Sequence, residues 1–384
     1  MAKGIYVGVD NIARKVKKLY FGVDGVARKV TKGYIGVDGV ARPFFSGEKK
    51  LVYYGTTTGL SEARVEISTA TVGNYALFAG GLTSTSSSGI TTQTPKSNVD
   101  TYDINLVKGT ATNLYASVYR LASASMGNYA LFGGGGMSTT TKNSYITGKL
   151  RAYDANLVTS TPSDLSVARR DLSATAVGNY ALFGGGFYDA EYRAEVQSYN
   201  SNLVRGNATA LSVGRMNLKA TTVGNYALFA GGNTGSGSRV VDSYDINLVK
   251  GTPTDLGASM TYHTATTIGE YALFAGGATY TTTSSTKLNR VVAYNANLVR
   301  SLATTLSVAR RQLASTSIGN YALFGGGYGS SSVANVDTYD INLVKGTTDD
   351  LSAGRSQLAS VTIGNYALFS GSSTNNVMDV YALV

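Results

Sequence analysis

Gly178-Asn179-Tyr180-Ala181-Leu182-Phe183 is one of seven near-identical stretches that decide the fold of this 384-residue chain. The other copies begin at Gly73, Gly127, Gly224, Gly269, Gly319 and Gly364, and the spacings along the chain are 54, 51, 46, 45, 50 and 45 residues. A second phrase, of the form Tyr-Asp-Ile-Asn-Leu-Val, follows six copies and begins at Tyr102, Tyr153, Tyr199, Tyr244, Tyr294 and Tyr339. Self-similarity at this period means that one supersecondary unit is repeated.

Each repeat predicts four short antiparallel strands. In the third copy they cover residues 171–177, 180–183, 196–199 and 203–211. The Gly-Asn pair between the first two strands fits a type II′ turn, and Glu270 in the fifth copy is also permitted at the second position of that turn. Four strands in each of seven units predict an all-β chain with a seven-bladed β-propeller. The small residues of the first strands suit the wall of a narrow central channel.

The two ends of the repeat region predict how the ring of blades closes. Residues 51–60 align with the fourth strand at 106–114, but no first three strands precede them. The last repeat reaches a third strand at Tyr381 and stops at Val384 without a fourth. The N-terminal strand should therefore complete the last blade and leave no open sheet edge.

The repeat region, residues 51–384, resembles the kelch-repeat family. Paired glycines close the second strand of six repeats, at Gly80/Gly81, Gly134/Gly135, Gly185/Gly186, Gly231/Gly232, Gly276/Gly277 and Gly326/Gly327. The family's later Tyr-Asp pair stands at Tyr102/Asp103, Tyr153/Asp154, Tyr244/Asp245 and Tyr339/Asp340. The sequence departs from the family pattern in two ways, because the chain has no Trp and the last repeat carries Ser370-Gly371-Ser372 where the pair is expected. The resemblance implies the propeller architecture.

Residues 1–45 contain a different repeat, with a period of 14 residues. Asp24-Gly25 and Asp38-Gly39 are strong two-residue hairpin turns, so we expect a basic β-meander, followed by a linker at 46–50. Residues 1–50 hold 11 Lys and Arg against 4 Asp and Glu, which would suit nucleic acid, an anionic surface or simply a solvated hairpin face. The segment resembles short repeats at the start of phage and prophage structural proteins of Gram-positive hosts, which implies assembly. The predicted assembly residues are Tyr6, Arg14, Tyr20, Arg28, Tyr34 and Arg42.

The composition argues against catalysis and against a bound cofactor. With no Cys and a single His, His263, the chain lacks the soft ligands of a copper or thiolate site, and a Ser-His-Asp triad would have to use His263. A packed or surface role is the alternative for this histidine. Asp349-Asp350 suits a solvated turn better than an acid/base pair, and the Gly-rich runs lack the Lys-Ser/Thr of a phosphate loop. We therefore expect a protein without metal, cofactor or enzyme activity.

The loops between second and third strands are the most variable part of the repeats, ranging from 17 residues in the first (Leu82–Asn98) to between 5 and 9 in four others. Antiparallel geometry puts them on one rim with the connections between blades. Aromatic and hydroxyl side chains there suit a carbohydrate or protein ligand, although Ser/Thr-rich loops could equally serve only to solvate the rim. The aromatic candidates are Tyr145, Phe187, Tyr188, Tyr192, Tyr262, Tyr280 and Tyr328.

Five repeats also carry an arginine nine residues before the turn glycine, at Arg64, Arg169, Arg215, Arg310 and Arg355. A ring of arginines around the channel mouth could bind an anionic polymer. The alternative is that each guanidinium is a structural hydrogen-bond donor, as in the kelch pattern.

These features predict a non-enzymatic phage or prophage virion protein. Residues 1–45 would bind other virion proteins, or further copies of the chain in a trimeric β-structure. The propeller would face outward to bind a host-surface glycan or protein, as a tail or baseplate receptor-binding protein or a capsid-surface fibre. No signal peptide or membrane span is found, as expected for a protein made in the bacterial cytoplasm and released by lysis, and nucleic acid is not the favoured partner. An intracellular kelch-type scaffold is the second hypothesis, and a sugar-active enzyme is the third.

Overall fold

The structure of the protein is a computed structural model. It describes residues 6–9, 12–15, 19–23, 26–30, 32–37, 40–46, 49–87, 90–137, 145–281 and 284–384, and its side chains from residue 49 onward except 86–91. The described residues contain strands, turns and loops but no helix. They form two compact units, residues 52–382 and residues 1–51 with 383–384.

Seven four-stranded antiparallel sheets make up the larger unit, as predicted. In chain order, the strands of blades 1 to 3 are β8 (Ser68–Val72), β9 (Tyr75–Ala79), β12 (Val99–Asp103), β13 (Lys108–Ala111); β14 (Ala122–Met126), β15 (Tyr129–Gly133), β16 (Leu150–Asp154), β17 (Thr159–Ser160); and β18 (Ser173–Val177), β19 (Tyr180–Gly184), β22 (Val196–Asn200), β23 (Arg205–Ala208). Those of blades 4 to 6 are β24 (Lys219–Val223), β25 (Tyr226–Ala230), β26 (Val241–Asp245), β27 (Lys250–Gly251); β28 (Thr264–Ile268), β29 (Tyr271–Ala275), β32 (Val291–Asn295), β33 (Arg300–Ala303); and β34 (Ala314–Ile318), β35 (Tyr321–Gly325), β36 (Val336–Asp340), β37 (Lys345–Thr347).

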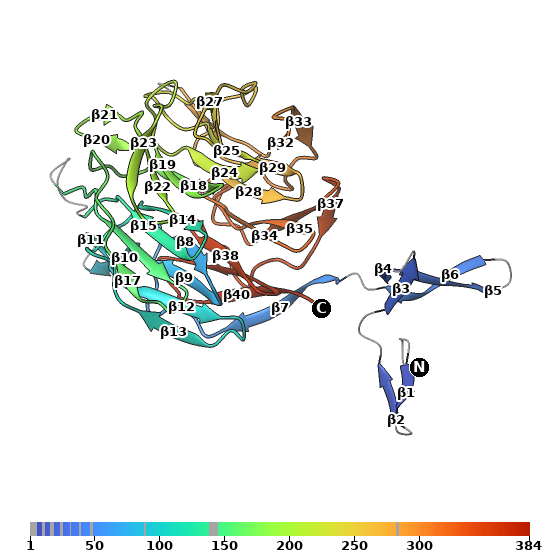
Figure 1. Cartoon of the computed structure of the whole chain (residues 1–384). Helices are drawn as coiled ribbons and strands as arrows, with labels where there is room; N and C mark the ends of the chain where they lie inside the picture. The colour runs from blue at the N-terminus through green and yellow to red at the C-terminus, as the bar shows by residue number, and fades with distance from the viewer. Residues whose placement is uncertain are drawn as a thin grey trace. The chain divides into compact units, whose positions relative to one another are not determined.

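Blade 7 is completed by the N-terminal strand. It consists of β38 (Ala359–Ile363), β39 (Tyr366–Ser370), β40 (Met378–Leu383) and β7 (Leu51–Thr57), hydrogen-bonded in that order. Reciprocal backbone hydrogen bonds of 2.9 and 3.0 Å join Lys50 and Val384 and make β7 antiparallel to β40. The first strands of the seven blades surround the axis (Figure 1), and each contacts the first strands on both sides of it.

A tyrosine in each third strand ties its blade to the preceding one. Tyr244, for example, is fully buried, and its hydroxyl donates to the carbonyl oxygen of Thr209 in the preceding connection at 2.6 Å. The same bond recurs around the ring, from Tyr102, Tyr153, Tyr199, Tyr294, Tyr339 and Tyr381. Tyr102 donates to Thr58, just after β7, so the bond also spans the closure. This bond explains why the tyrosine of the second repeated phrase is kept in every blade, including blade 7, where the rest of the phrase is missing.

The paired glycines are required where neighbouring blades approach closely. Gly80 has a φ of 67°, and a Cβ at this position would lie 2.7 Å from the carbonyl oxygen of Val118 in blade 2. The next amide, that of Gly81, donates to the same oxygen at 2.8 Å. A side chain would separate the two blades, so the glycines serve packing and leave no room for a ligand there.

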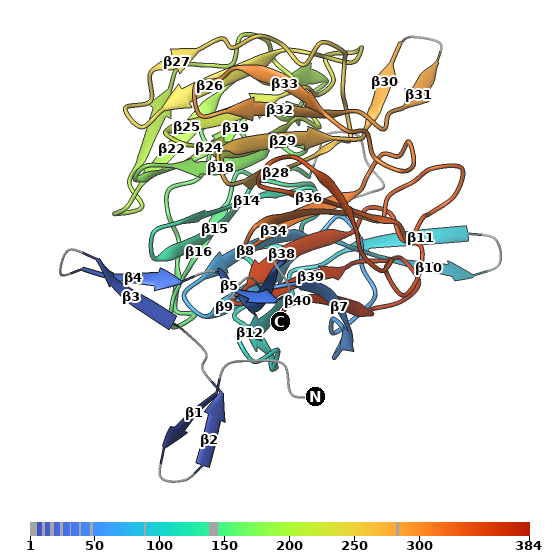
Figure 2. The ribbon, with the colours of Figure 1, turned by 90° about the vertical axis from the view of Figure 1, so that its right-hand side faces the viewer.

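The two rims of the propeller differ. The first-to-second and third-to-fourth turns lie on one rim, here called the turn rim. The opposite loop rim carries the longer loops, including the hairpins β10 (Leu82–Ser87) with β11 (Ile90–Pro95), β20 (Phe187–Tyr188) with β21 (Glu191–Tyr192), and β30 (Ala278–Tyr280) with β31 (Ser285–Lys287). Figure 2 shows the β10–β11 and β30–β31 hairpins extending from the same side. β7 begins on the turn rim and ends on the loop rim, where the amide of Leu60 donates to the carbonyl oxygen of Asn376.

The N-terminal residues form three separate hairpins and not the continuous meander that we predicted. The pairs are β1 (Tyr6–Val9) with β2 (Ile12–Lys15), β3 (Leu19–Val23) with β4 (Val26–Val30), and β5 (Lys32–Val37) with β6 (Val40–Ser46). One residue separates β4 from β5, fewer than a two-residue hairpin turn needs, so β5 cannot fold back onto β4. The pairing of Val23 with Val26 agrees with the predicted turn, although Asp24-Gly25 and Asp38-Gly39 themselves lie outside the described residues. Ser46, the predicted first linker residue, belongs to β6.

We predict that β7 is required for a stable ring. Deletion of residues 1–60 removes the fourth strand of blade 7 and the Thr58 carbonyl that Tyr102 binds, so β40 becomes an exposed edge that can pair with other chains. Deletion of residues 1–45 leaves both features intact. Light scattering and thermal melting should show aggregation and a lower midpoint only for the longer deletion, and equal melting of the two truncated proteins would contradict the closure.

Candidate functional site

Seven residues at the loop-rim end of the channel share an uncommon backbone conformation. Each precedes a first strand by two residues and has a φ between 53° and 58°, which is rare for residues other than glycine and asparagine. This mouth ring consists of Glu66, Arg120, Asp171, Asn217, Tyr262, Gln312 and Gln357. The left-handed conformation turns the peptide groups along the ring, so that five amides donate to the carbonyl oxygen of the mouth residue in the preceding blade at 2.8 to 3.1 Å.

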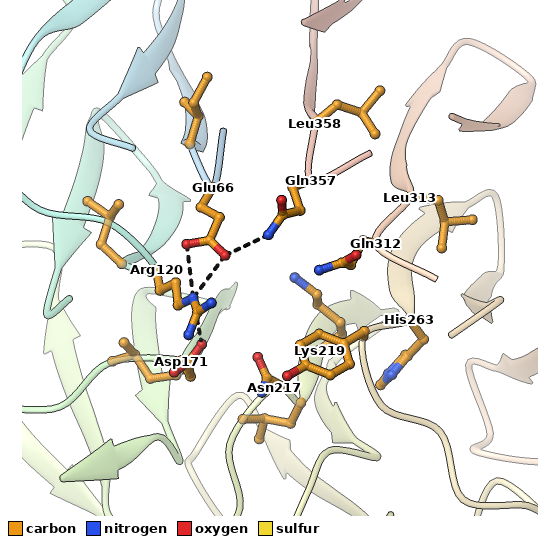
Figure 3. A pocket seen from close by; sticks show the side chains of 15 residues that line it. Glu66, Arg120, Asp171, Asn217, Lys219, His263, Gln312, Leu313, Gln357 and Leu358 are labelled. Carbon is orange, nitrogen blue, oxygen red and sulfur yellow. Dashed lines mark hydrogen bonds and ion pairs between the residues drawn. The ribbon is translucent and has the colours of Figure 1, made fainter. Parts of the chain in front are cut away.

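The mouth ring places seven side chains of six types around one opening. Arg120 Nε lies 2.9 Å from both carboxylate oxygens of Glu66 and 3.6 Å from Asp171, while Gln357 donates to Glu66 at 2.8 Å. Figure 3 shows this chain of contacts along one side of the mouth. Burial alone would lower the pKa of Arg120, but the charges of Asp171 and Glu66 outweigh it and raise the pKa. Arg170 pairs with the other oxygen of Asp171 at 2.5 Å, so both carboxylates are neutralised.

Lys219 is the one charged side chain among the described residues that line the channel beneath the mouth. It begins β24 and lines both the hollow at the mouth, of about 160 Å³, and the hydroxyl-lined space of about 240 Å³ beneath it. Its ammonium has no hydrogen bond or ion pair within the described residues, and no dashed line reaches it in Figure 3. The side chain is exposed to the water of the channel, but the protein that surrounds the channel partly desolvates it and lowers the pKa of Lys219, with Asp171 opposing the shift.

His263 occupies a packing position. The equivalent residue in five blades is a leucine that fits between neighbouring blades against the glycine pair, as Leu218 does against Gly185. The imidazole is 1% exposed and lies 6.0 Å from the ring centre of Phe274. Burial, with a smaller contribution from the charge of Lys219, lowers the pKa of His263 to about 3. The structure therefore agrees with the alternative in which His263 has a packing role.

The five predicted arginines lie beneath the loop rim and do not surround the mouth as free donors. All are at most 2% exposed. Arg64, Arg215 and Arg310 pair with Asp100, Asp242 and Asp337 at 2.7 to 2.8 Å, Arg355 pairs with Asp379, and Arg169 donates to Gln197. The expectation of an arginine ring that binds ligand is therefore corrected in favour of the structural alternative.

The blades that lack this arginine also lack its partner. In blade 5 the two positions hold Met260 and Val292, both fully buried. In blade 2 they hold Val118 and Arg151, and Arg151 donates to Thr159. In blades 2 and 5 the guanidinium and the carboxylate are therefore replaced together, which fits the cost of burying a charge without its partner. Blade 3 is the exception, because the buried Arg169 donates to the neutral Gln197 in place of a carboxylate.

The predicted rim aromatics form two groups near the mouth. Tyr262 packs against Tyr280 with ring centres 5.8 Å apart, the Tyr280 hydroxyl accepts from Arg311, and the Arg311 guanidinium lies 5.7 Å from the ring centre of Tyr328. On blade 3, Phe187 and Tyr192 are 5.4 Å apart, and Tyr188 belongs to the same hairpin. Tyr145 is 56% exposed and belongs to neither group.

Sequence reasoning included Tyr262 but missed the rest of the mouth ring and Lys219. An alignment of the repeats contains a signal for Lys219, because the residues aligned with it are all small and uncharged: Ser68, Ala122, Ser173, Thr264, Ala314 and Ala359.

The predicted turn role of Asp350 fits its carboxylate, which accepts a hydrogen bond from the Val336 amide at 3.1 Å. The described residues contain no group of three or more Asp, Glu, His or Cys arranged to hold a metal ion. Within the same residues, no helix long and apolar enough to cross a membrane occurs.

The comparisons with known proteins bear on the fold alone. No protein-family model matches the chain, and no curated protein does. Among solved structures, that of a protein called YjhT is similar, with a TM-score of 0.57 over 75% of this chain and 98% of that one. The two sequences are 11% identical, so this similarity supports the propeller architecture alone.

We predict that His263→Leu reduces acid sensitivity. The folded pKa of about 3 lies below the ordinary value of 6.5, so the unfolded chain takes up the proton first. The stability tied to this residue is complete above pH 6.5 and is lost as the pH falls toward 3, at about 1.4 kcal/mol per pH unit. The chain has one histidine, so denaturation between pH 7 and 5 should show a shallower loss for the variant. Parallel profiles would mean that the imidazole titrates normally.

We also predict that the arginine–aspartate pairs are coupled. Arg310→Met should destabilise the protein by about 3–5 kcal/mol because Asp337 stays buried, with Lys345 at 2.8 Å moderating the loss. The double variant Arg310→Met/Asp337→Val copies blade 5 and should lose less than Arg310→Met alone. Chemical denaturation of the three variants measures the coupling, and additive losses would contradict it.

Proposed function

We propose that this chain is a non-enzymatic binding protein of a phage or prophage particle, and that the loop rim of its propeller binds a glycan or protein on the host surface. The N-terminal hairpin segment would attach it to the particle. The proposal rests on the division between a repeated framework and an unrepeated mouth. The buried tyrosine, glycine and arginine positions repeat in most blades, whereas the mouth ring differs in nearly every blade.

The difference between repeated framework positions and unrepeated mouth positions supports a binding role, because every blade needs the same framework residues to fold. A position that serves only the fold can hold the same residue in each blade, as the fully buried third-strand tyrosines do. The mouth residues already meet the needs of the fold through their backbone ring, which does not depend on side-chain identity. Different side chains around a shared opening therefore favour recognition of an asymmetric ligand.

The course of the chain supports the division of labour between the two segments. β7 enters the propeller on the turn rim, whereas the mouth ring, the aromatic groups and the long hairpins lie on the loop rim. The chain therefore enters the propeller on the rim opposite the proposed binding surface. For residues 1–45, the resemblance to repeats of virion proteins and the net basic charge support attachment to an acidic partner surface.

An intracellular kelch-type scaffold remains the second candidate, and one observation favours it. The turn rim repeats an exposed valine in six blades, each between 59% and 63% exposed. These residues are Val107, Val158, Val204, Val249, Val299 and Val344. Repeated exposed apolar side chains are a common feature of protein-binding surfaces.

One experiment tests the proposal and separates the two candidates. Particles from a producing strain are purified with the full chain, with residues 46–384 alone, or with Tyr188, Tyr192 and Tyr280 all changed to Ala. We expect the full chain and the tyrosine variant in particles, and the truncated chain outside them. Particles with the tyrosine variant should attach to host cells at least tenfold more weakly, while its melting temperature stays near that of the native protein because these residues are only half-buried.

The control is a variant with the exposed turn-rim residues Val249 and Val344 changed to Thr. It should attach to cells normally. Absence of the full chain from particles would contradict the virion proposal, and normal incorporation of residues 46–384 would contradict attachment through the N-terminal segment. Loss of binding to a cytoplasmic protein by the valine variant alone would favour the scaffold.

A further inference from the structure

Lys219 is not needed by the framework of its blade. The other six first strands begin with Ser, Thr or Ala at this position, and the surrounding backbone pairing is the same in each. A lysine facing a channel is costly to place, because its ammonium loses part of its hydration. The described side chains give it no hydrogen bond or ion pair in return. An unpaired cation at the junction of two hollows is therefore a candidate ligand contact.

The charges around the mouth leave room for one negative charge. Glu66 and Asp171 are balanced by Arg120 and Arg170, at contacts of 2.5 to 3.6 Å. Lys219 adds one positive charge without a partner inside the channel; Arg311, which also has no carboxylate partner among the described residues, instead donates to the Tyr280 hydroxyl and does not line either hollow. A ligand with a single anionic group would neutralise Lys219, whereas a dianion such as a phosphate monoester would keep one charge without a counter-cation, because Arg120 and Arg170 are already paired. A lysine is moreover a point charge and lacks the fork with which arginine binds phosphate in a bidentate manner.

The walls around Lys219 suit a hydroxylated ligand. Amide groups of Asn217, Gln312 and Gln357 surround the mouth and can both donate and accept hydrogen bonds. At the level of the lysine and just beyond it, the channel is lined by hydroxyl groups, including Ser68, Ser173, Thr264 and Ser315. The half-buried ring of Tyr262 offers an aromatic surface beside the opening.

We infer that the channel mouth binds an acidic sugar, a pyranose with one carboxylate, and that Lys219 binds the carboxylate. The sugar hydroxyls would exchange hydrogen bonds with the mouth amides and the hydroxyl groups below. This inference rests on the proposed function, since it names the class of glycan that the loop rim recognises.

Calorimetric titration of the full chain with D-glucuronate tests the inference, with D-glucose and glucose 6-phosphate as comparison ligands. Glucuronate should bind at least tenfold more tightly than either. Lys219→Ala should reduce glucuronate affinity to that of glucose. The variant carries the residue that blades 2, 6 and 7 have at this position, so its fold should be retained.

Relocating the charge provides a matched control. Lys219→Ala combined with Ala314→Lys returns one ammonium to the same level of the channel from blade 6. This variant should recover part of the preference for glucuronate over glucose, which a purely structural role for Lys219 would not produce. Equal affinity for glucuronate and glucose, unchanged binding by Lys219→Ala, or tighter binding of glucose 6-phosphate would each overturn the inference.

The outcome is separable from that of the proposed function. If the tyrosine variant loses cell attachment while Lys219→Ala attaches normally and glucuronate does not bind, the loop rim is a binding surface but the acidic-sugar site is wrong. If glucuronate binds through Lys219 while the chain is absent from particles, the site stands and the virion role falls.

Discussion

Closure of the ring by β7 is the constraint on which the rest of the propeller depends. Six junctions between successive blades are reinforced by the continuous chain, but the junction within blade 7 between β40 and β7 is made by noncovalent contacts alone, namely backbone hydrogen bonds and the packing of Tyr53 against Tyr381. Near this junction, the hydroxyl of Tyr102 donates to the carbonyl oxygen of Thr58, and the amide of Glu66 donates to the carbonyl oxygen of Gln357. The channel and its mouth exist only while these contacts hold the first and last blades together.

Within the closed ring, structural and recognition residues occupy different levels. Four of the five arginines that might have been ligand contacts pair with buried carboxylates, and the fifth, Arg169, donates to Gln197. Blade 5 shows that Met260 and Val292 can replace such a pair. Such pairs add little net stability over well-packed apolar residues, so their repetition reflects the shared ancestry of the repeats as much as energetic need. The side chains of the mouth ring can differ between blades, because the backbone of these residues makes the hydrogen bonds that link the blades.

The sequence was sufficient for the architecture, because period, turn glycines and strand alternation are local signals that repeat seven times. It also placed the closing strand and identified Tyr262. It did not separate buried arginines from exposed ones, because burial depends on Asp100 or Asp337, which lie 36 and 27 residues from their partners Arg64 and Arg310. The mouth ring was missed because left-handed Glu, Arg or Gln has no local signature. The meander was wrong because it needs a return turn at residues 31–33, whereas Lys32 and Gly33 belong to β5 and one residue separates β5 from β4.

The direction of β7 has a mechanical consequence. The strand runs from the turn rim, where the chain continues to residues 1–50, to the loop rim, where Leu60 and Thr58 are held. Tension between a tether at residue 50 and a ligand gripped at the loop rim would run parallel to the strand. The ladder between β7 and β40 would then be loaded in shear, with all its hydrogen bonds resisting together instead of parting one after another. The strand that closes the fold is thus also oriented to withstand pulling.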